Sequence, residues 1–236
     1  MLVQKVTSEN IKTTTVEEIS DLKTAINNVY ESTIYIEVSN NRGVISSGSG
    51  FVYKEDEKYG YVLTNYHVID GGSKFEITFT DTSEVEAELV SGDEYYDIAV
   101  LKVDKDKIKS VSTIGDSSNL ELGDTVFTVG APVDSALYSQ SVTRGIVSGK
   151  DRMIEVSYSG TTADYYVKVL QTDAAINPGN SGGALVNSKG EVDFNISNNG
   201  VDAVQQGGMA VNADGSLVAL GTEYGTVKVW EVEYDA

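Results

Sequence analysis

Short runs of β-branched and aromatic residues, separated by clusters of Gly, Asn, Asp and Ser, constrain the fold of this chain more than any other feature. About ten such runs follow one another at 8- to 15-residue spacing, over residues 33–39, 48–54, 59–69, 74–80, 84–90, 97–103, 124–130, 141–149, 164–173 and 182–188. This spacing leaves no room for the helices of βαβ units and is typical of antiparallel sandwiches and barrels. The sequence therefore predicts an all-β fold.

One helix is expected, near the N-terminus. Apolar residues recur at steps of three and four behind a capping box formed by Thr15 and Glu18, which predicts a short helix over about residues 16–30. The apolar residues are Val16, Ile19, Leu22, Ile26 and Val29. Residues 1–15 are polar and Thr-rich, and we interpret them as a flexible arm.

The strands are interrupted by a polar, loop-like stretch at about residues 110–122. We place there the boundary between two β-barrels of one domain, residues 16–214, with barrel one at about 30–112 and barrel two at about 120–214. The last residues, 215–236, are expected to form a β-hairpin extension of uncertain role.

Composition excludes several kinds of chemistry. The chain has no cysteine, so disulfides, thiolate nucleophiles and Cys-based metal sites are ruled out. Its formal charge of −19 argues against nucleic-acid binding, which needs a basic face. The acidic residues show no spacing typical of a Ca²⁺-binding loop. The one histidine, His67, must carry any imidazole chemistry.

The sequence shows no membrane segment. No stretch approaches 18 uninterrupted apolar residues, and the N-terminus lacks the apolar core of a signal peptide. On this ground alone the protein is either cytosolic or exported by a segment outside this sequence.

Three motifs at strand ends carry candidate catalytic residues. They are TNYHV with His67, YYDIAVLKV with Asp97, and TDAAINPGNSGGAL with Ser181. A serine hydroxyl needs an adjacent base to act as a nucleophile, imidazole is a base suited to neutral pH, and a buried carboxylate orients the imidazole ring. The backbone N–H groups of Gly179 and Ser181 are candidates for an oxyanion hole, because glycine permits the required backbone angles.

Each motif alone has a structural alternative: a packed histidine, a turn aspartate or a glycine-rich turn. Their order along the chain decides between the two interpretations. His67, Asp97 and Ser181 follow one another in the order found in chymotrypsin-type β-barrels, with His and Asp in the first predicted barrel and Ser in the second. The site is therefore expected in the cleft between the barrels.

From about residue 30 to residue 192 the chain resembles the HtrA/Deg family of trypsin-like serine proteases. The matching stretches are GSGFVY, YVLTNYHVI, DIAVLKV, GDSSNLELGDTVFTVGAP, VTRGIVSG and TDAAINPGNSGGALVNSKGEV. The resemblance implies two six-stranded antiparallel β-barrels, with His67 as general base, Asp97 as its orienting carboxylate and Ser181 as nucleophile. It also implies that Gly179 and Ser181 form the oxyanion hole and that Asn180 holds the shape of that loop.

The resemblance further implies a serine endopeptidase that hydrolyses unfolded or misfolded polypeptides through an acyl-enzyme, in protein quality control, without a metal or cofactor. Members of this family are commonly trimers and extracytoplasmic bacterial proteins. It thus implies polypeptide substrates, a homotrimer and a periplasmic, cell-surface or secreted location, with the export segment absent from this sequence.

Two departures from the family pattern keep alternatives open. After Val192 the sequence reads DFNISNNG where the family has an apolar pocket wall, so a catalytically impaired relative that binds or scaffolds peptides is the first alternative. Residues 209–233 resemble half of a WD-repeat blade, and partner binding through this segment is the second alternative. A simple β-hairpin that closes or pads barrel two is the favoured interpretation of that segment.

Overall fold

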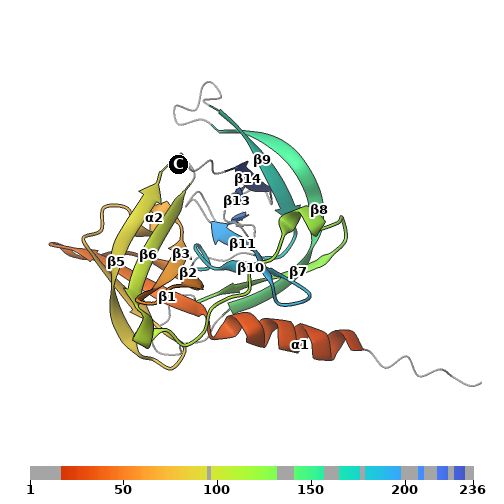
Figure 1. Cartoon of the computed structure of the whole chain (residues 1–236). Helices are drawn as coiled ribbons and strands as arrows, with labels where there is room; N and C mark the ends of the chain where they lie inside the picture. The colour runs from red at the N-terminus through yellow and green to blue at the C-terminus, as the bar shows by residue number, and fades with distance from the viewer. Residues whose placement is uncertain are drawn as a thin grey trace, which may run out of the picture.

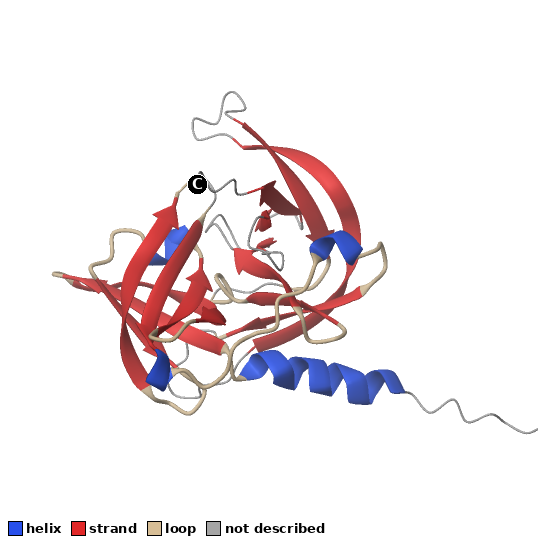
Figure 2. Cartoon of the chain, in the orientation of Figure 1, coloured by secondary structure: helices blue, strands red, loops and turns tan. Residues whose placement is uncertain are grey.

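Strands dominate the computed structural model, in which a closed barrel and a second sheet lie side by side (Figure 2). It describes residues 17–94, 97–131, 141–156, 165–175, 179–197, 207–209, 217–222 and 226–231. The predicted N-terminal arm, which includes the Thr15 cap of the predicted helix, lies outside this set, as do the residues between 197 and 207. No helix among the described residues is long and apolar enough to cross a membrane.

The N-terminal half forms the predicted six-stranded barrel (Figure 1). Apolar residues of its strands are buried in one core, at alternate positions in several strands. In β6, for example, Ala99, Leu101 and Val103 are buried while the residues between them are partly exposed. The closed order is β1-β2-β3-β6-β5-β4. The strands are β1 (Thr33–Asn40), β2 (Gly43–Glu55), β3 (Tyr59–Thr64), β4 (Lys74–Thr78), β5 (Glu84–Asp93) and β6 (Ile98–Asp104).

The C-terminal half forms an eight-stranded sheet, and the predicted second closed barrel is not observed among the described strands. The order across the sheet is β12 (Gly207–Met209), β11 (Val192–Ser197), β10 (Ala184–Asn187), β7 (Thr125–Gly130), β8 (Ser141–Val156), β9 (Tyr165–Thr172), β14 (Thr226–Glu231) and β13 (Leu217–Thr222). The edge of β9 pairs with β14, so the sheet continues into the C-terminal hairpin. Its last strand, β13, lies near β12 but is not hydrogen-bonded to it among the described residues.

The predicted helix is present as α1 (Glu17–Tyr30), and it lies along one side of the second sheet (Figure 1). Ala25 and Val29, one turn apart, are fully buried against the sheet. The helix ends where the hydroxyls of Ser32 and Thr33 donate to the Val29 carbonyl, at 2.8 and 3.0 Å. These bonds satisfy a carbonyl that the helix itself leaves without a partner.

A shared apolar core joins the two halves. It combines side chains of α1, of β2 and β3 in the barrel, and of β7, β10 and β11 in the sheet; its central members are Phe51, Leu63, Phe127, Val129 and Val186. The segment between the halves, which includes the short 3-10 helix Ser117–Asn119, is bonded to both, since Ser112 N–H donates to Val52 O and Gly115 N–H donates to Val192 O. The two halves are therefore held in a defined relation.

One predicted strand is shorter than expected. The run over residues 59–69 predicts a single strand, but β3 ends at Thr64 and α2 (Tyr66–Ile69) follows. A 3-10 turn, Lys105–Lys107, directly follows β6. The apolar character of the run is unchanged across Asn65, so the pattern alone predicts continued strand.

Candidate functional site

His67 and Asp97 form a short, direct contact at the end of the first barrel. His67 lies on α2, and its Nδ1 is 2.7 Å from Oδ2 of Asp97, which lies just before β6. The other carboxylate oxygen, Oδ1, accepts the backbone N–H of His67 at 2.7 Å. One carboxylate thus fixes both the backbone and the ring of the histidine.

The backbone of Asp97 is held in an unusual conformation. Its φ is +52°, in the left-handed region that non-glycine residues seldom adopt and in which Asp and Asn are enriched. The Asn65 side-chain amide donates to the Asp97 carbonyl at 2.9 Å, and both residues are buried. Asn65 occupies the N-cap position of α2 but makes no side-chain cap bond there. The acceptor for the first turn of α2 is instead the carboxylate of Asp97, which directly precedes β6. A carboxylate is electrostatically favourable at the N-terminus of a helix.

Ser181 lies in a tight loop that leads into β10. Gly179 and Gly182, on either side of it, have φ of +94° and +87°. The loop closes on itself through the Gly183 N–H, which donates to the Asn180 carbonyl at 2.9 Å. Ser181 is 6% exposed and Asn180 is fully buried.

The Ser181 loop and the His67 helix meet at Gly48 on β2. A Cβ on Gly48 would lie 3.0 Å from the Ser181 carbonyl oxygen and 2.8 Å from Cγ2 of Val68, the residue after His67. The structure thus brings together, at the junction of the barrel and the second sheet, the segments that hold His67, Asp97 and Ser181. Only a residue without a side chain fits between them.

Exposure divides the site into a buried and an accessible part. The Asp97 side chain is 8% exposed, whereas that of His67 is 33% exposed. An ionised carboxylate in this position strengthens its bond to the imidazole, because water does not screen it. The ring therefore has a buried partner at Nδ1 and is open to solvent elsewhere. Within the described part of the chain, no cluster of His, Asp or Glu suited to a metal ion is found.

The sequence did not predict two residues of this arrangement, Asn65 and Ser49. Asn65 anchors Asp97, and Ser49, on β2, is bonded to the Ser181 loop. Both residues stand in motifs that the sequence singles out, LTNYHV and GSGFV, but nothing in these motifs marks them as partners of Asp97 or of the Ser181 loop. The side-chain amide of Asn180, which was expected to hold the loop, has no hydrogen-bond partner among the described residues, while its backbone carbonyl accepts the Gly183 N–H.

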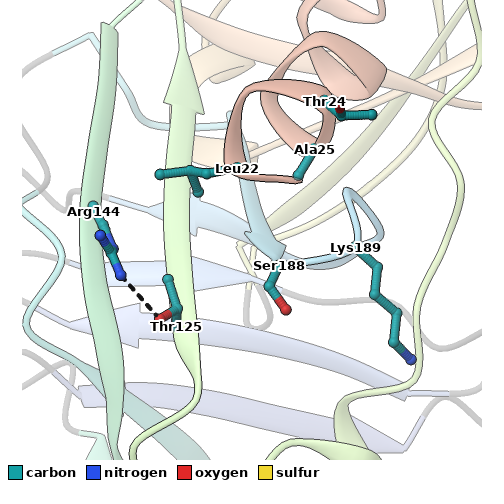
Figure 3. Close-up of a pocket in the computed structure, with 7 residues that line it drawn as sticks. All are labelled: Leu22, Thr24, Ala25, Thr125, Arg144, Ser188 and Lys189. Carbon is teal, nitrogen blue, oxygen red and sulfur yellow. Dashed lines mark hydrogen bonds between the residues drawn. The ribbon is translucent and has the colours of Figure 1, made fainter. Parts of the chain in front are cut away.

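A cavity of about 550 Å³ lies apart from this site (Figure 3). Its walls come from α1, the neighbouring strands β7 and β8, and the turn after β10; the lining residues are Leu22, Thr24, Ala25, Thr125, Arg144, Ser188 and Lys189. Arg144 Nη2 lies 3.4 Å from Thr125 Oγ1 across two strands, while Lys189 points away from Arg144. None of the predicted catalytic residues lines this cavity.

Comparison with known proteins identifies the family. Residues 48–192, more than half of the chain, match the trypsin-like peptidase domain. This chain belongs to the trypsin-like peptidase family. The match to a peptidase domain and the names of the relatives, which are serine proteases, support the enzyme class predicted from the sequence, a serine-type endopeptidase.

The related proteins are HtrA-type proteases. The chain is 46% identical over 147 residues to "Serine protease Do-like HtrA" of Bacillus subtilis, an alignment covering 62% of this chain and 32% of that protein. It is 40% identical over 174 residues to the Lactococcus lactis subsp. cremoris protein of the same name, covering 73% and 42%. A "Probable periplasmic serine endoprotease DegP-like" of Halomonas elongata is 44% identical over 147 residues, covering 62% and 28%.

Solved structures give the same assignment. The serine endoprotease from Yersinia pestis superposes with a TM-score of 0.60 at 31% identity, over 75% of this chain and 57% of that one. The "HtrA-type protease AlgW with tripeptide" superposes with a TM-score of 0.64 at 28% identity, over 89% and 59%. The peptidase domain is thus HtrA-type, as the sequence predicted.

The chain spans about a third of the length of the curated relatives it matches. The resemblance of its last residues to a WD-repeat blade is not borne out. The family match ends at residue 192, and β13 and β14 form a hairpin that pairs with β9 of the same sheet as β10.

Proposed function

We propose that this chain is a serine endopeptidase that hydrolyses unfolded or misfolded polypeptides, with Ser181 as nucleophile, His67 as general base and Asp97 as the carboxylate that orients it. The 2.7 Å contact of the His67 ring with a buried Asp97, beside the segment that carries Ser181, is the observation that supports this assignment most strongly. The names of the relatives, which are serine proteases, agree with it.

In the proposed reaction, the Ser181 hydroxyl attacks the carbonyl carbon of the peptide bond while Nε2 of His67 takes its proton. Asp97 keeps the proton of the ring on Nδ1 and stabilises the imidazolium. Collapse of the tetrahedral intermediate breaks the C–N bond, and the imidazolium returns a proton to the departing amine. Water, activated by the same base, then hydrolyses the acyl-enzyme and restores Ser181.

The proposed oxyanion hole consists of the backbone N–H groups of Gly179 and Ser181. The positive φ of Gly179 supports the proposal, because it gives the loop a turn that a residue with a side chain adopts only at a cost. Removing one such donor from a serine protease slows catalysis by about 10²- to 10³-fold.

The biological setting follows from the relatives. The Halomonas protein is named a periplasmic protease, and we propose an extracytoplasmic bacterial location and a role in protein quality control for this chain also. The homotrimer and the detailed shape of the pocket beyond Val192 stay predictions.

The decisive experiment uses a fluorophosphonate probe and casein, a largely unfolded polypeptide. The wild type should be labelled and should degrade casein, whereas Ser181→Ala should lose labelling and at least about 10³-fold of the activity. Ser188→Ala, an exposed serine on the turn after β10, is the matched control and should behave as the wild type. A folded wild type that is neither labelled nor active would instead support the impaired, peptide-binding relative.

A further inference from the structure

Ser49 is a fully buried residue of β2 whose three polar groups all bond to the surroundings of the proposed nucleophile. Its N–H donates to the Ser181 carbonyl at 2.7 Å, and its hydroxyl donates to the Gly179 carbonyl at 2.6 Å. The same hydroxyl accepts the N–H of Ala131, at the end of β7, at 2.7 Å. Its carbonyl accepts the Thr64 hydroxyl at 2.7 Å.

Ser49 therefore connects three segments that are distant in the sequence. It belongs to the first barrel, whereas Ala131 and the loop from Gly179 to Ser181 belong to the second sheet. The fit is close, because a Cβ on Gly182 would lie 1.9 Å from the Ser49 carbonyl oxygen. The loop is thus seated directly on Ser49.

The hydroxyl bond acts at a place where the backbone has freedom to turn. A peptide unit is planar, so holding the Gly179 carbonyl also fixes the direction of the Asn180 N–H. Gly179 has no Cβ, and without this bond its ψ and the following peptide plane have few steric limits. The Gly179–Asn180 peptide stands between the two N–H groups, so a change in the ψ of Gly179 turns the Ser181 N–H relative to the Gly179 N–H. A displacement of about 1 Å in a catalytic group can cost 10²-fold in rate.

We propose that Ser49 is a positioning residue for the oxyanion hole. Its hydroxyl holds the Gly179–Asn180 peptide so that the N–H groups of Gly179 and Ser181 point to the same substrate oxygen. The inference rests on the proposed function, since it assigns Ser49 a part in that reaction. Ser49 does not touch substrate, and it acts only through the loop.

The test compares Ser49→Ala with the wild type in steady-state hydrolysis of a peptide substrate. The variant should lose about 10- to 100-fold in kcat with KM within about twofold, because oxyanion stabilisation acts on the transition state and not on substrate binding. The shape of the pH profile should be retained, because His67 and Asp97 are unchanged. Ser49→Cys, which keeps the side chain's place but donates weakly, should show a smaller loss, and it serves if the alanine variant does not fold.

Ser32→Ala is the matched control. Ser32 is a fully buried serine of the same half, and its hydroxyl also makes two bonds, to Val29 O and to the Ser112 hydroxyl. It should be destabilised in thermal unfolding to a similar degree, yet keep kcat within about twofold. Equal losses of kcat in the two variants, or an unaffected Ser49→Ala with an active wild type, would overturn the inference alone. An inactive wild type would overturn the proposed function and this inference with it.

Discussion

The orientation of Asp97 depends on a neighbouring side chain. Its positive φ aims the carboxylate at His67, and the Asn65 amide holds the carbonyl of this strained residue at 2.9 Å. A non-glycine residue in the left-handed region costs about 1–3 kcal/mol and persists only where its surroundings hold it there. Asn65 is therefore expected to matter for catalysis through its hold on Asp97.

Replacing Asn65 by Ala should lower kcat/KM about 10-fold or more, because Asp97 is then free to relax and His67 loses its alignment. It should also destabilise the fold by about 1–3 kcal/mol, since the buried Asp97 carbonyl loses its side-chain donor. Peptide hydrolysis and urea unfolding measure the two effects. Asn40→Ala, which removes an exposed 3.4 Å side-chain bond to the carbonyl of Gly71, just beyond the end of α2, is the control and should leave kcat/KM unchanged. Full activity in a destabilised Asn65→Ala would show that Asn65 is structural only.

Two glycines with similar positive φ angles allow the cost of backbone strain to be separated from the cost of a steric clash. Gly123 has φ of +94° and open space where a Cβ would lie, whereas Gly182 has φ of +87° and the Ser49 carbonyl oxygen 1.9 Å from the corresponding position. Gly123→Ala should cost about 1–2 kcal/mol in urea unfolding, the cost of the left-handed backbone alone. Gly182→Ala should cost more than about 4 kcal/mol or prevent folding, because backbone must move. Equal losses in the two variants would contradict the close seating of the loop on Ser49.

At the scale of elements, helix α2 shows why part of the site was not predictable. The strand pattern continues through YVLTNYHVI, and nothing local marks a helix of four residues. The helix depends on Asp97, 30 residues away, which accepts the His67 N–H. The sequence was sufficient for α1, whose apolar residues recur at helical spacing. It also singled out His67, Asp97 and Ser181, whose catalytic roles stay predictions. The contact of His67 with Asp97, and the bonds made by Asn65 and Ser49, arise only from the tertiary structure.

The hairpin between β2 and β3 carries a pH-sensitive turn. Hydrogen bonds from the Tyr61 hydroxyl and from the N–H groups of Tyr59 and Lys58 lower the pKa of Asp56 to about 2. Because this pKa is below the unfolded value of 3.8, the ionised carboxylate stabilises the fold above about pH 4, and this contribution disappears as the pH falls through about 2.

Asp56→Ala should therefore lower the melting temperature at pH 6 and make little difference at pH 2. Thermal unfolding of both proteins between pH 2 and pH 6 measures this convergence. Tyr61→Phe removes the largest of the causes and should show a smaller difference of the same shape. A difference between wild type and Asp56→Ala that is constant over the whole range would contradict the assigned bonds.

At the scale of the molecule, the spacing of the β-branched and aromatic runs and the family resemblance predicted the first barrel correctly, but they did not predict how the second sheet ends. Alternation tells which face of a strand is buried, and it does not tell which strand pairs with an edge. The edge of β9 pairs with β14, with Thr226 opposite Gln171 and Val229 opposite Lys168. This partner comes from the segment that resembled a propeller blade in sequence, and only its pairing distinguishes the two interpretations.

The C-terminal hairpin is accordingly expected to protect the sheet and not to bind a partner of its own. Deleting residues 215–236 removes β13 and β14 and leaves β9 as an exposed edge, which is prone to pair with other chains. The truncated protein should melt at least about 5 °C lower and self-associate in size-exclusion chromatography, while its folded fraction keeps fluorophosphonate labelling, because Ser181 lies before the deletion. Deleting only 232–236, beyond β14, is the control and should change neither property. An unchanged melting temperature and a monodisperse truncated protein would show that the pairing of β14 with β9 contributes nothing to the sheet, and would favour partner binding as the role of this segment.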